Sequence, residues 1–163
     1  MSEIQDTFDN AVDAALSMLP PRMDSRDARV QLATTMLQES RGIHRRQING
    51  PARGLWQFEP GTRRSRGGVW GVYLHDASRE HLRRLCSLLR CEFDPRAIYK
   101  DLEFDDVLAA GVARLLLWTD PRPLPAVDDI EGSWAYYLRN WKPGRPHPET
   151  WPEFRRTAIG MVP

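Results

Sequence analysis

Disulfide chemistry, net charge and long apolar runs are all scarce in this sequence. Cys86 and Cys91 are too few for a disulfide framework, so we expect two buried or half-buried thiols in a reducing cytoplasm, with a local bridge as the open alternative. The formal net charge is +1, which argues against binding to nucleic acid or an anionic membrane surface through overall charge. No apolar run approaches the roughly 20 residues of a transmembrane helix, so we expect no membrane span.

Signals for export and for metal binding are also scarce. The N-terminus, MSEIQDTFDN, is acidic and has no apolar core, so we expect synthesis in the cytoplasm without a Sec signal peptide. The four histidines are scattered and no Cys/His cluster has zinc spacing, so we expect no metal and no cofactor. A length of 163 residues fits one domain, 1–163.

What the sequence does contain is helical periodicity. Apolar residues recur at helical spacing from Ile4 to Leu19, and that first helix ends at Pro20-Pro21. The sequence therefore predicts a mainly α fold, with Asp106–Trp118, capped by Asp105, as its central core helix. The further predicted helices are one capped by Asp24 or Ser25, Asp76–Arg90, Pro95–Leu102, one capped by Asp128 or Asp129 over Ile130–Asn140, and Trp151–Met161 after Thr150.

Glu39 closes the helix that follows Asp24 or Ser25. Gly42 is the expected stop, because glycine readily takes the left-handed conformation just past a helix end. The exposed carbonyls of that end disfavour an ionised carboxylate, and apolar surroundings would raise its pKa further. A carboxyl group that keeps its proton near neutral pH is suited to act as a general acid. The alternative is a solvated glutamate paired with Arg41 or Arg45.

A basic, glycine-punctuated loop follows. Its cations are Arg41, His44, Arg45, Arg46 and Arg53. They either form a basic wall of a cleft or pair locally in a solvated loop, and we favour local pairing except for residues that face Glu39. Leu55–Glu59 is short and rich in aromatic residues, which predicts one strand of a small β-hairpin. The stretch 61–71, GTRRSRGGVWG, predicts a mobile basic loop.

Two segments carry a resemblance to a known family. Glu39-Ser40 followed by Gly54-Leu55-Trp56-Gln57 resembles the lysozyme-like superfamily, in particular lytic transglycosylases and goose-type lysozymes, and phage or prophage proteins of this kind. In those families the Glu of the Glu-Ser pair is catalytic, and a Gly-Leu-Met-Gln segment lines the sugar cleft. Trp56 stands here where Met is usual. Glu59, two positions after Gln57, matches a second acidic residue of goose-type lysozymes; the alternative is that it pairs with Arg53, Arg63 or Arg64.

The same resemblance implies further substrate-binding residues. Gly54 would allow close backbone approach to a ligand, and Gln57 can hydrogen-bond a sugar hydroxyl or N-acetyl group, with local backbone satisfaction as the alternative. Trp56 is either core or a sugar platform. Ala135-Tyr136-Tyr137 is similar to an Ala-Tyr-Asn motif whose Tyr lies beside the catalytic Glu, so either tyrosine is a candidate. A tight loop, 141–144 (WKPG), is expected to close the cleft, with Trp141 as a further sugar contact.

The resemblance implies a peptidoglycan-cleaving lysozyme-like domain. We expect lytic transglycosylase activity, in which Glu39 acts as acid and base at the bond between N-acetylmuramic acid and N-acetylglucosamine. A hydrolytic muramidase that uses Glu39 and Glu59 is the first alternative. A non-catalytic virion structural protein or a glycan-binding module is the second. The expected partner is the peptidoglycan strand, which the protein would reach through holin-dependent release or delivery with a phage virion.

Overall fold

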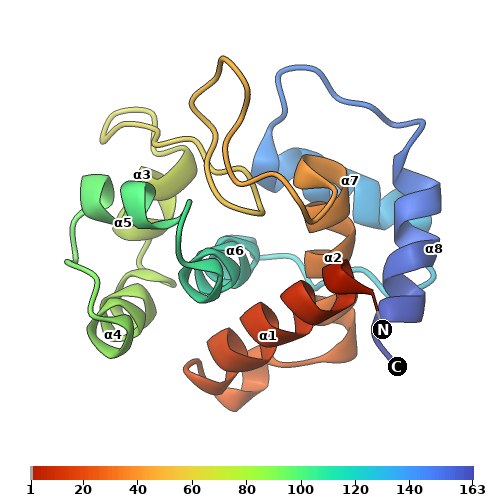
Figure 1. The fold of residues 1–163 in the computed structure, drawn as a ribbon, viewed down its shortest axis with the longest axis horizontal. Helices are drawn as coiled ribbons and strands as arrows, with labels where there is room; N and C mark the ends of the chain where they lie inside the picture. Colours follow the sequence, from red (N-terminus) through yellow and green to blue (C-terminus); the bar gives the residue numbers. More distant parts are fainter. Residues whose placement is uncertain (1) are drawn as a thin grey trace.

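The computed structural model describes residues 2–163 as a mainly helical fold (Figure 1). No helix in this range is both long and apolar enough to cross a membrane. In chain order the elements are α1 (Glu3–Ser17), the short 3₁₀ helix η1 (Pro21–Met23), α2 (Arg26–Ser40), α3 (Gly68–Leu74), α4 (Arg79–Leu89), α5 (Pro95–Asp101), α6 (Asp106–Thr119), α7 (Ile130–Trp141) and α8 (Trp151–Met161).

Helix α6 forms the centre of the core, as the sequence predicted. It packs against α1, α2, α3 and α4, and Figure 1 shows it in the middle of the molecule. Gly111 allows α4 to pack closely, because a Cβ atom there would come within 2.3 Å of Leu85 Cδ2. On α6 itself, the side chains of Leu108, Val112 and Leu115 are fully buried. The apolar periodicity of this segment therefore identified the core helix correctly.

Local capping residues begin several helices where the sequence placed them. The Ser25 hydroxyl accepts from the backbone N–H of Ala28 at 3.1 Å, so Ser25 rather than Asp24 caps α2. Asp105 caps α6, and Asp129 caps α7. Thr150 precedes α8 without a capping bond, since its hydroxyl donates to other groups.

Two predictions about the loops differ from the structure. Helix α2 ends at Ser40, and the left-handed conformation begins one residue before the expected glycine, with φ 61° at Arg41 and φ 74° at Gly42. Leu55–Glu59 does not form a strand, and the hairpin is not confirmed. Two isolated antiparallel bridges, Arg46 with Arg53 and Arg53 with Phe58, enclose a tight turn instead. A turn satisfies these backbone groups locally, so no extended strand is needed.

The second basic loop is shorter than predicted because its last part is helical. Residues 68–71 belong to α3, whose first amide groups, those of Val69 and Trp70, donate to the carbonyls of Glu59 and Pro60. Gly68 permits this closure, since its φ is +54° and a Cβ atom would lie 2.1 Å from Glu59 O. The backbone of Glu59 is therefore anchored to α3.

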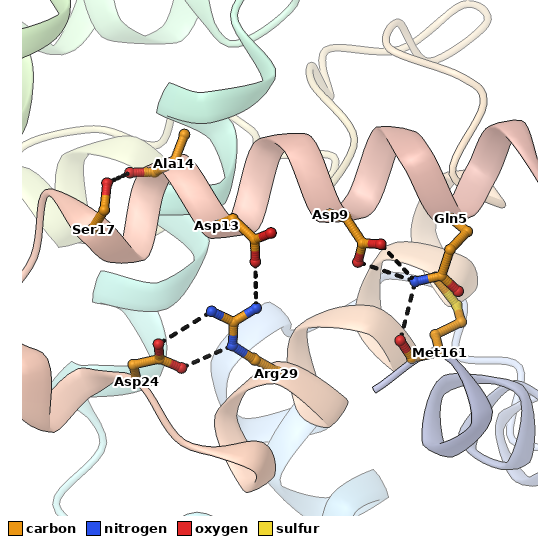
Figure 2. A network of polar contacts seen from close by, with 8 residues as sticks. All are labelled: Gln5, Asp9, Asp13, Ala14, Ser17, Asp24, Arg29 and Met161. Carbon is orange, nitrogen blue, oxygen red and sulfur yellow. Dashed lines mark hydrogen bonds and ion pairs between the residues drawn. The ribbon is translucent and has the colours of Figure 1, made fainter. Parts of the chain in front are cut away.

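An exposed polar network ties α1 to the beginning of α2 and to the C-terminal end of α8 (Figure 2). Arg29 donates to Asp13 at 2.6 Å and to Asp24 at 2.8 Å, which joins α1 to the segment before α2. Gln5 donates to Asp9 and to the carbonyl of Met161. Figure 1 shows the start of α1 close to the C-terminal end of α8, in agreement with the bond from Gln5 to Met161.

A buried arginine joins α8 to α2. The Arg155 side chain is fully buried and donates to Gln31 Oε1, Thr34 Oγ1 and the carbonyls of Ala126 and Val127. Four acceptors thus satisfy a guanidinium that has no carboxylate partner among residues 2–163. This network fixes α2, and therefore Glu39, relative to the C-terminal helices.

The two cysteines are free and buried. Burial raises the pKa of the Cys86 thiol to about 11, so the thiol stays protonated at neutral pH.

Candidate active site

Glu39 lies in the last turn of α2. Two loops near α2 and α7 rise on the same side of the molecule (Figure 1). One is the loop after α2, and the other joins α7 to α8. Together with the end of α7 they enclose a pocket of about 520 Å³ around Glu39, which we call the Glu39 pocket. Its lining residues are Gln38, Glu39, Gln47, Ala52, Gln57, Glu59, Tyr137, Trp141, Lys142, Pro143, Gly144, Arg145 and His147.

Tyr137 is the direct partner of Glu39. Its hydroxyl donates to Glu39 Oε1 at 2.8 Å, although the two residues are 98 positions apart. The ring of Tyr137 is buried and stacks on Trp151, with ring centroids 4.8 Å apart, and on Trp141 at 6.3 Å. Because this stack fixes the ring, the hydroxyl is held in place, and Glu39 Oε2 remains as the oxygen that can carry a proton.

The Glu39 carboxyl is held near the point of half-protonation at neutral pH. Burial raises its pKa from 4.5 to about 7, the hydrogen bond from Tyr137 lowers it in part, and the negative charge of Glu59 raises it further. No ion pair of residues 2–163 includes Glu39, so no cation offsets this cost. A carboxyl group in this state can both donate and accept a proton near pH 7.

Glu59 lines the same pocket and is exposed. The sequence offered Arg53, Arg63 and Arg64 as pairing partners for it, but the described part of the chain contains no ion pair of Glu59, and Arg53 approaches Glu103 instead. Glu59 is therefore a second carboxyl group beside Glu39, open to solvent.

A second pocket extends the first. It measures about 540 Å³ and shares Glu59, Trp141 and Lys142 with the Glu39 pocket, so the two adjoin, and we call them together the Glu39 cleft. Its other side is lined by residues of the 60–68 loop, which include Arg66, and by Arg139 of α7. Two adjoining pockets whose lining includes carboxyl, amide and guanidinium groups can hold an extended, hydroxyl-rich ligand.

The tertiary structure brings five of the predicted site residues together. Gln57 lines the Glu39 pocket. Its side-chain amide also donates to the carbonyl of Gly54 at 2.9 Å, so it forms the local backbone hydrogen bond that was the alternative role. Trp141 lines both pockets, and its indole N–H donates to the carbonyl of Trp56. The five are Glu39, Gln57, Glu59, Tyr137 and Trp141.

Three other predicted site residues support the pocket from behind. Ser40 is buried and donates to the carbonyl of Leu55 at 2.6 Å, which joins the end of α2 to the following turn. Gly54 allows close approach to protein rather than ligand, since a Cβ atom would lie 2.8 Å from Leu102 O. Trp56 is fully buried and donates to the carbonyl of Leu32, so the structure places it in the core rather than on a sugar platform.

Tyr136 lies away from Glu39. Its side chain is buried, and its hydroxyl donates to the carbonyl of Leu117 at 3.0 Å. It lines a separate pocket formed by α6, α7 and the connector between them. Successive residues point in directions about 100° apart around a helix, so Tyr136 and Tyr137 face different pockets.

The basic loop after α2 pairs locally, as we favoured. Arg45 forms two hydrogen bonds with Asp106, at 2.7 and 2.8 Å. Arg46 and Arg53 both approach Glu103, and Arg41 lies over the ring of Phe154. These contacts hold the loop against α6, α8 and the segment between α5 and α6, and they leave its arginines outside the lining of the Glu39 pocket.

Several lining residues were missed by the sequence reasoning. Lys142 belongs to the 141–144 loop, which was expected to close the cleft. Arg145 and His147 line the pocket too, but no motif in the sequence indicated them. Gln38 holds this loop, because its amide donates to the carbonyl of His147 and its oxygen accepts from Thr150. The position of Gln38 directly before Glu39 was the one signal that could have identified it.

Comparisons with protein-family models, with curated proteins and with solved structures find no significant match to this chain. Among residues 2–163, no group of three or more His, Cys, Asp or Glu side chains is placed to hold a metal ion.

Proposed function

We propose that this protein is a lysozyme-like domain that cleaves peptidoglycan glycan strands as a lytic transglycosylase. The observation that carries the proposal is the Glu39 carboxyl, whose pKa is about 7 and which lies at the wall of a cleft under the hydroxyl of Tyr137. The residues Glu39, Gln57 and Tyr137, which the sequence resemblance implied, lie around one pocket, and this supports the same activity.

In the first step, protonated Glu39 donates its proton to the oxygen between N-acetylmuramic acid and N-acetylglucosamine. The bond from the muramic C1 to that oxygen breaks, and positive charge develops on the muramic ring. The ionised Glu39 that results keeps the hydrogen bond from Tyr137, which stabilises the carboxylate.

In the second step, the C6 hydroxyl of the same muramic residue attacks C1. The carboxylate of Glu39 takes the hydroxyl proton, so the enzyme returns to its starting state and a 1,6-anhydro ring closes. The sequence consumes no water and needs one carboxyl group.

A hydrolytic muramidase is the second candidate, and the position of Glu59 favours it. Glu59 lines the pocket of Glu39 and has no ion-pair partner among the residues described. As a general base it would activate water on the opposite face of the sugar, which requires carboxyl groups about 6.5–9.5 Å apart.

Digestion of purified peptidoglycan, with mass analysis of the fragments, tests both candidates. We expect anhydro-muramic ends from the wild type and no fragments from Glu39→Gln, with Glu92→Gln as a control of equal chemistry at an exposed site. Reducing muramic ends would support the muramidase instead. Glycan binding without any fragments from the wild type would leave a non-catalytic binding protein.

A further inference from the structure

The pocket lined by Tyr136 is rich in arginine. It measures about 460 Å³ and lies between η1, the end of α6, the proline-rich connector 120–124 and α7. Arg22, Arg114 and Arg122 all line it, and it shares no lining residue with either part of the Glu39 cleft. We call it the arginine pocket.

Arg114 is the buried cation of this pocket. It is 3% exposed, its Nε–H donates to the carbonyl of Met23 at 2.7 Å, and its guanidinium lies 5.6 Å from the ring centre of Trp118. No ion pair of residues 2–163 includes it, and this is the one protein hydrogen bond of its side chain there. Because no fully buried side-chain nitrogen in this range lacks a partner, its terminal amino groups are not sealed from solvent, and Arg114 lines this pocket.

A comparison with Arg155 shows that the fold does not leave every buried arginine with unpaired donors. It is also buried without a carboxylate, yet acceptors from four residues surround its guanidinium. The fold can therefore satisfy a buried arginine completely when the residue is structural. Arg114 has one protein acceptor, and its other donors, which have none, belong to a residue that lines the pocket.

The carboxylate in this pocket does not neutralise the arginines. Asp120 accepts from Arg139 and Asn140, which lie in the wall of the cleft, and from the backbone N–H of Arg122. Burial alone raises the pKa of Asp120, but these donors outweigh it and lower the pKa, so the carboxylate is ionised and already paired. Arg22 and Arg122 form no ion pair among the described residues, and the pocket keeps a positive excess.

We propose that the arginine pocket binds a phosphate monoester of a small organic molecule. The dianionic phosphoryl group would lie between Arg22, Arg114 and Arg122, because the guanidinium fork matches phosphate oxygens and three cations match two negative charges. The volume exceeds that of phosphate alone, and Pro121, Pro123 and Leu124 supply an apolar wall for the organic part.

Calorimetric titration with glycerol 3-phosphate, and with glycerol as the uncharged control, tests this proposal. The double variant Arg22→Ala/Arg122→Ala removes two exposed cations without touching the core, and we expect affinity to fall about tenfold or more. Arg84→Ala/Arg96→Ala removes the same charge from exposed helix positions elsewhere and should change affinity less than about twofold. Arg114→Lys keeps the charge but loses the fork, and should also weaken binding.

Vesicles distinguish the two sources of this chemistry. Sedimentation with vesicles that contain phosphatidic acid, lost in the Arg22→Ala/Arg122→Ala variant, would identify a lipid headgroup, whereas binding of soluble glycerol 3-phosphate alone would identify a free phosphorylated compound. Both outcomes support a phosphate monoester site. Equal weakening in the two double variants, or no more heat from glycerol 3-phosphate than from glycerol, overturns it. Binding is read without the lytic assay, so failure of the proposed lytic function would not affect this result.

Discussion

The two ends of helix α2 treat a carboxyl group in opposite ways. Before its first turn, Asp24 accepts from Arg29 at the surface, and that hydrogen bond lowers the pKa of Asp24 (Figure 2). In its last turn, Glu39 is enclosed without a cation, and burial raises its pKa to about 7. The first arrangement stabilises the folded chain, and the second costs stability while keeping a proton available.

This difference indicates which end of the helix is the better candidate for a functional site. A fold gains nothing from a buried carboxyl group without a cation, since ionisation there is opposed by the loss of hydration. The surrounding structure nevertheless holds Glu39 in place through Tyr137 and the stacked ring of Trp151. Destabilised groups of this kind cluster at sites of chemistry, and this places the candidate active site at the C-terminal end of α2.

Among variants that test this contrast between the two ends of α2, Glu39→Gln should have the largest effect. The change keeps the shape and removes the proton, so lytic activity should fall at least about a hundredfold in a peptidoglycan digestion assay. The stability of the folded protein should instead rise in this variant at alkaline pH. The folded pKa of about 7 lies above the ordinary 4.5, so wild type loses stability as pH rises through this window.

Thermal or urea unfolding at two pH values checks the second part. The Glu39→Gln variant should be more stable than wild type at pH 8, by about 1–3 kcal/mol, and nearly equal to it at pH 4. Equal stability at pH 8 would mean that the Glu39 carboxyl is ionised without cost, and the contrast with Asp24 would be lost.

Tyr137→Phe sharpens the comparison at the same end of the helix. Loss of the hydroxyl removes the hydrogen bond that lowers the pKa of Glu39, so that pKa should rise and the alkaline limb of the pH–rate profile should move upward. Turnover should fall about tenfold, the cost of one hydrogen bond to a carboxylate.

Tyr136→Phe is the matched control for this change. It removes the same atom from the neighbouring residue, whose hydroxyl bonds to Leu117 O in a separate pocket. Its pH–rate profile should coincide with that of the wild type. If both variants retained wild-type turnover and profile, the role of Tyr137 beside Glu39 would be structural.

Glu59→Gln has a smaller expected effect in the transglycosylase route. The charge of Glu59 raises the pKa of Glu39, so its removal should lower that pKa and move the alkaline limb to lower pH. Turnover at pH 6 should fall less than about tenfold, and the products should keep anhydro ends. A loss of about 10²–10⁴, with reducing ends from wild type, would assign Glu59 as the general base of a muramidase.

The smallest effect is expected at the other end of α2. Arg29→Ala removes two partly exposed ion pairs, with Asp13 and Asp24, and should lower stability by about 0.5–1.5 kcal/mol without changing lytic activity. The lowered pKa of Asp24 means that its contribution is present above its ordinary pKa and is lost as pH falls. The difference between wild type and variant should therefore shrink from pH 5 to pH 2 in urea unfolding.

Local chemistry determined much of the fold. Ser25, Asp105 and Asp129 cap helices within a few residues of themselves, so the sequence predicted where those helices begin. Apolar periodicity identified α6 as the core helix, and the segment Trp151–Met161 matches α8 at both ends. The hairpin failed because Leu55–Glu59 is too short for periodicity to separate a strand from a turn.

For the site, the sequence determined that Glu39 closes a helix and that Glu59 follows it on the chain. The tertiary structure decided that Tyr137 rather than Tyr136 reaches Glu39, that Trp56 is core, and that Glu59 shares the pocket. Sequence patterns reach about one helical turn, whereas these outcomes depend on contacts between segments far apart in the chain, such as Tyr137 and Glu39, which are 98 positions apart. The pKa of Glu39 belongs to the same class, because desolvation is produced by whichever side chains the packed fold places around the carboxyl group.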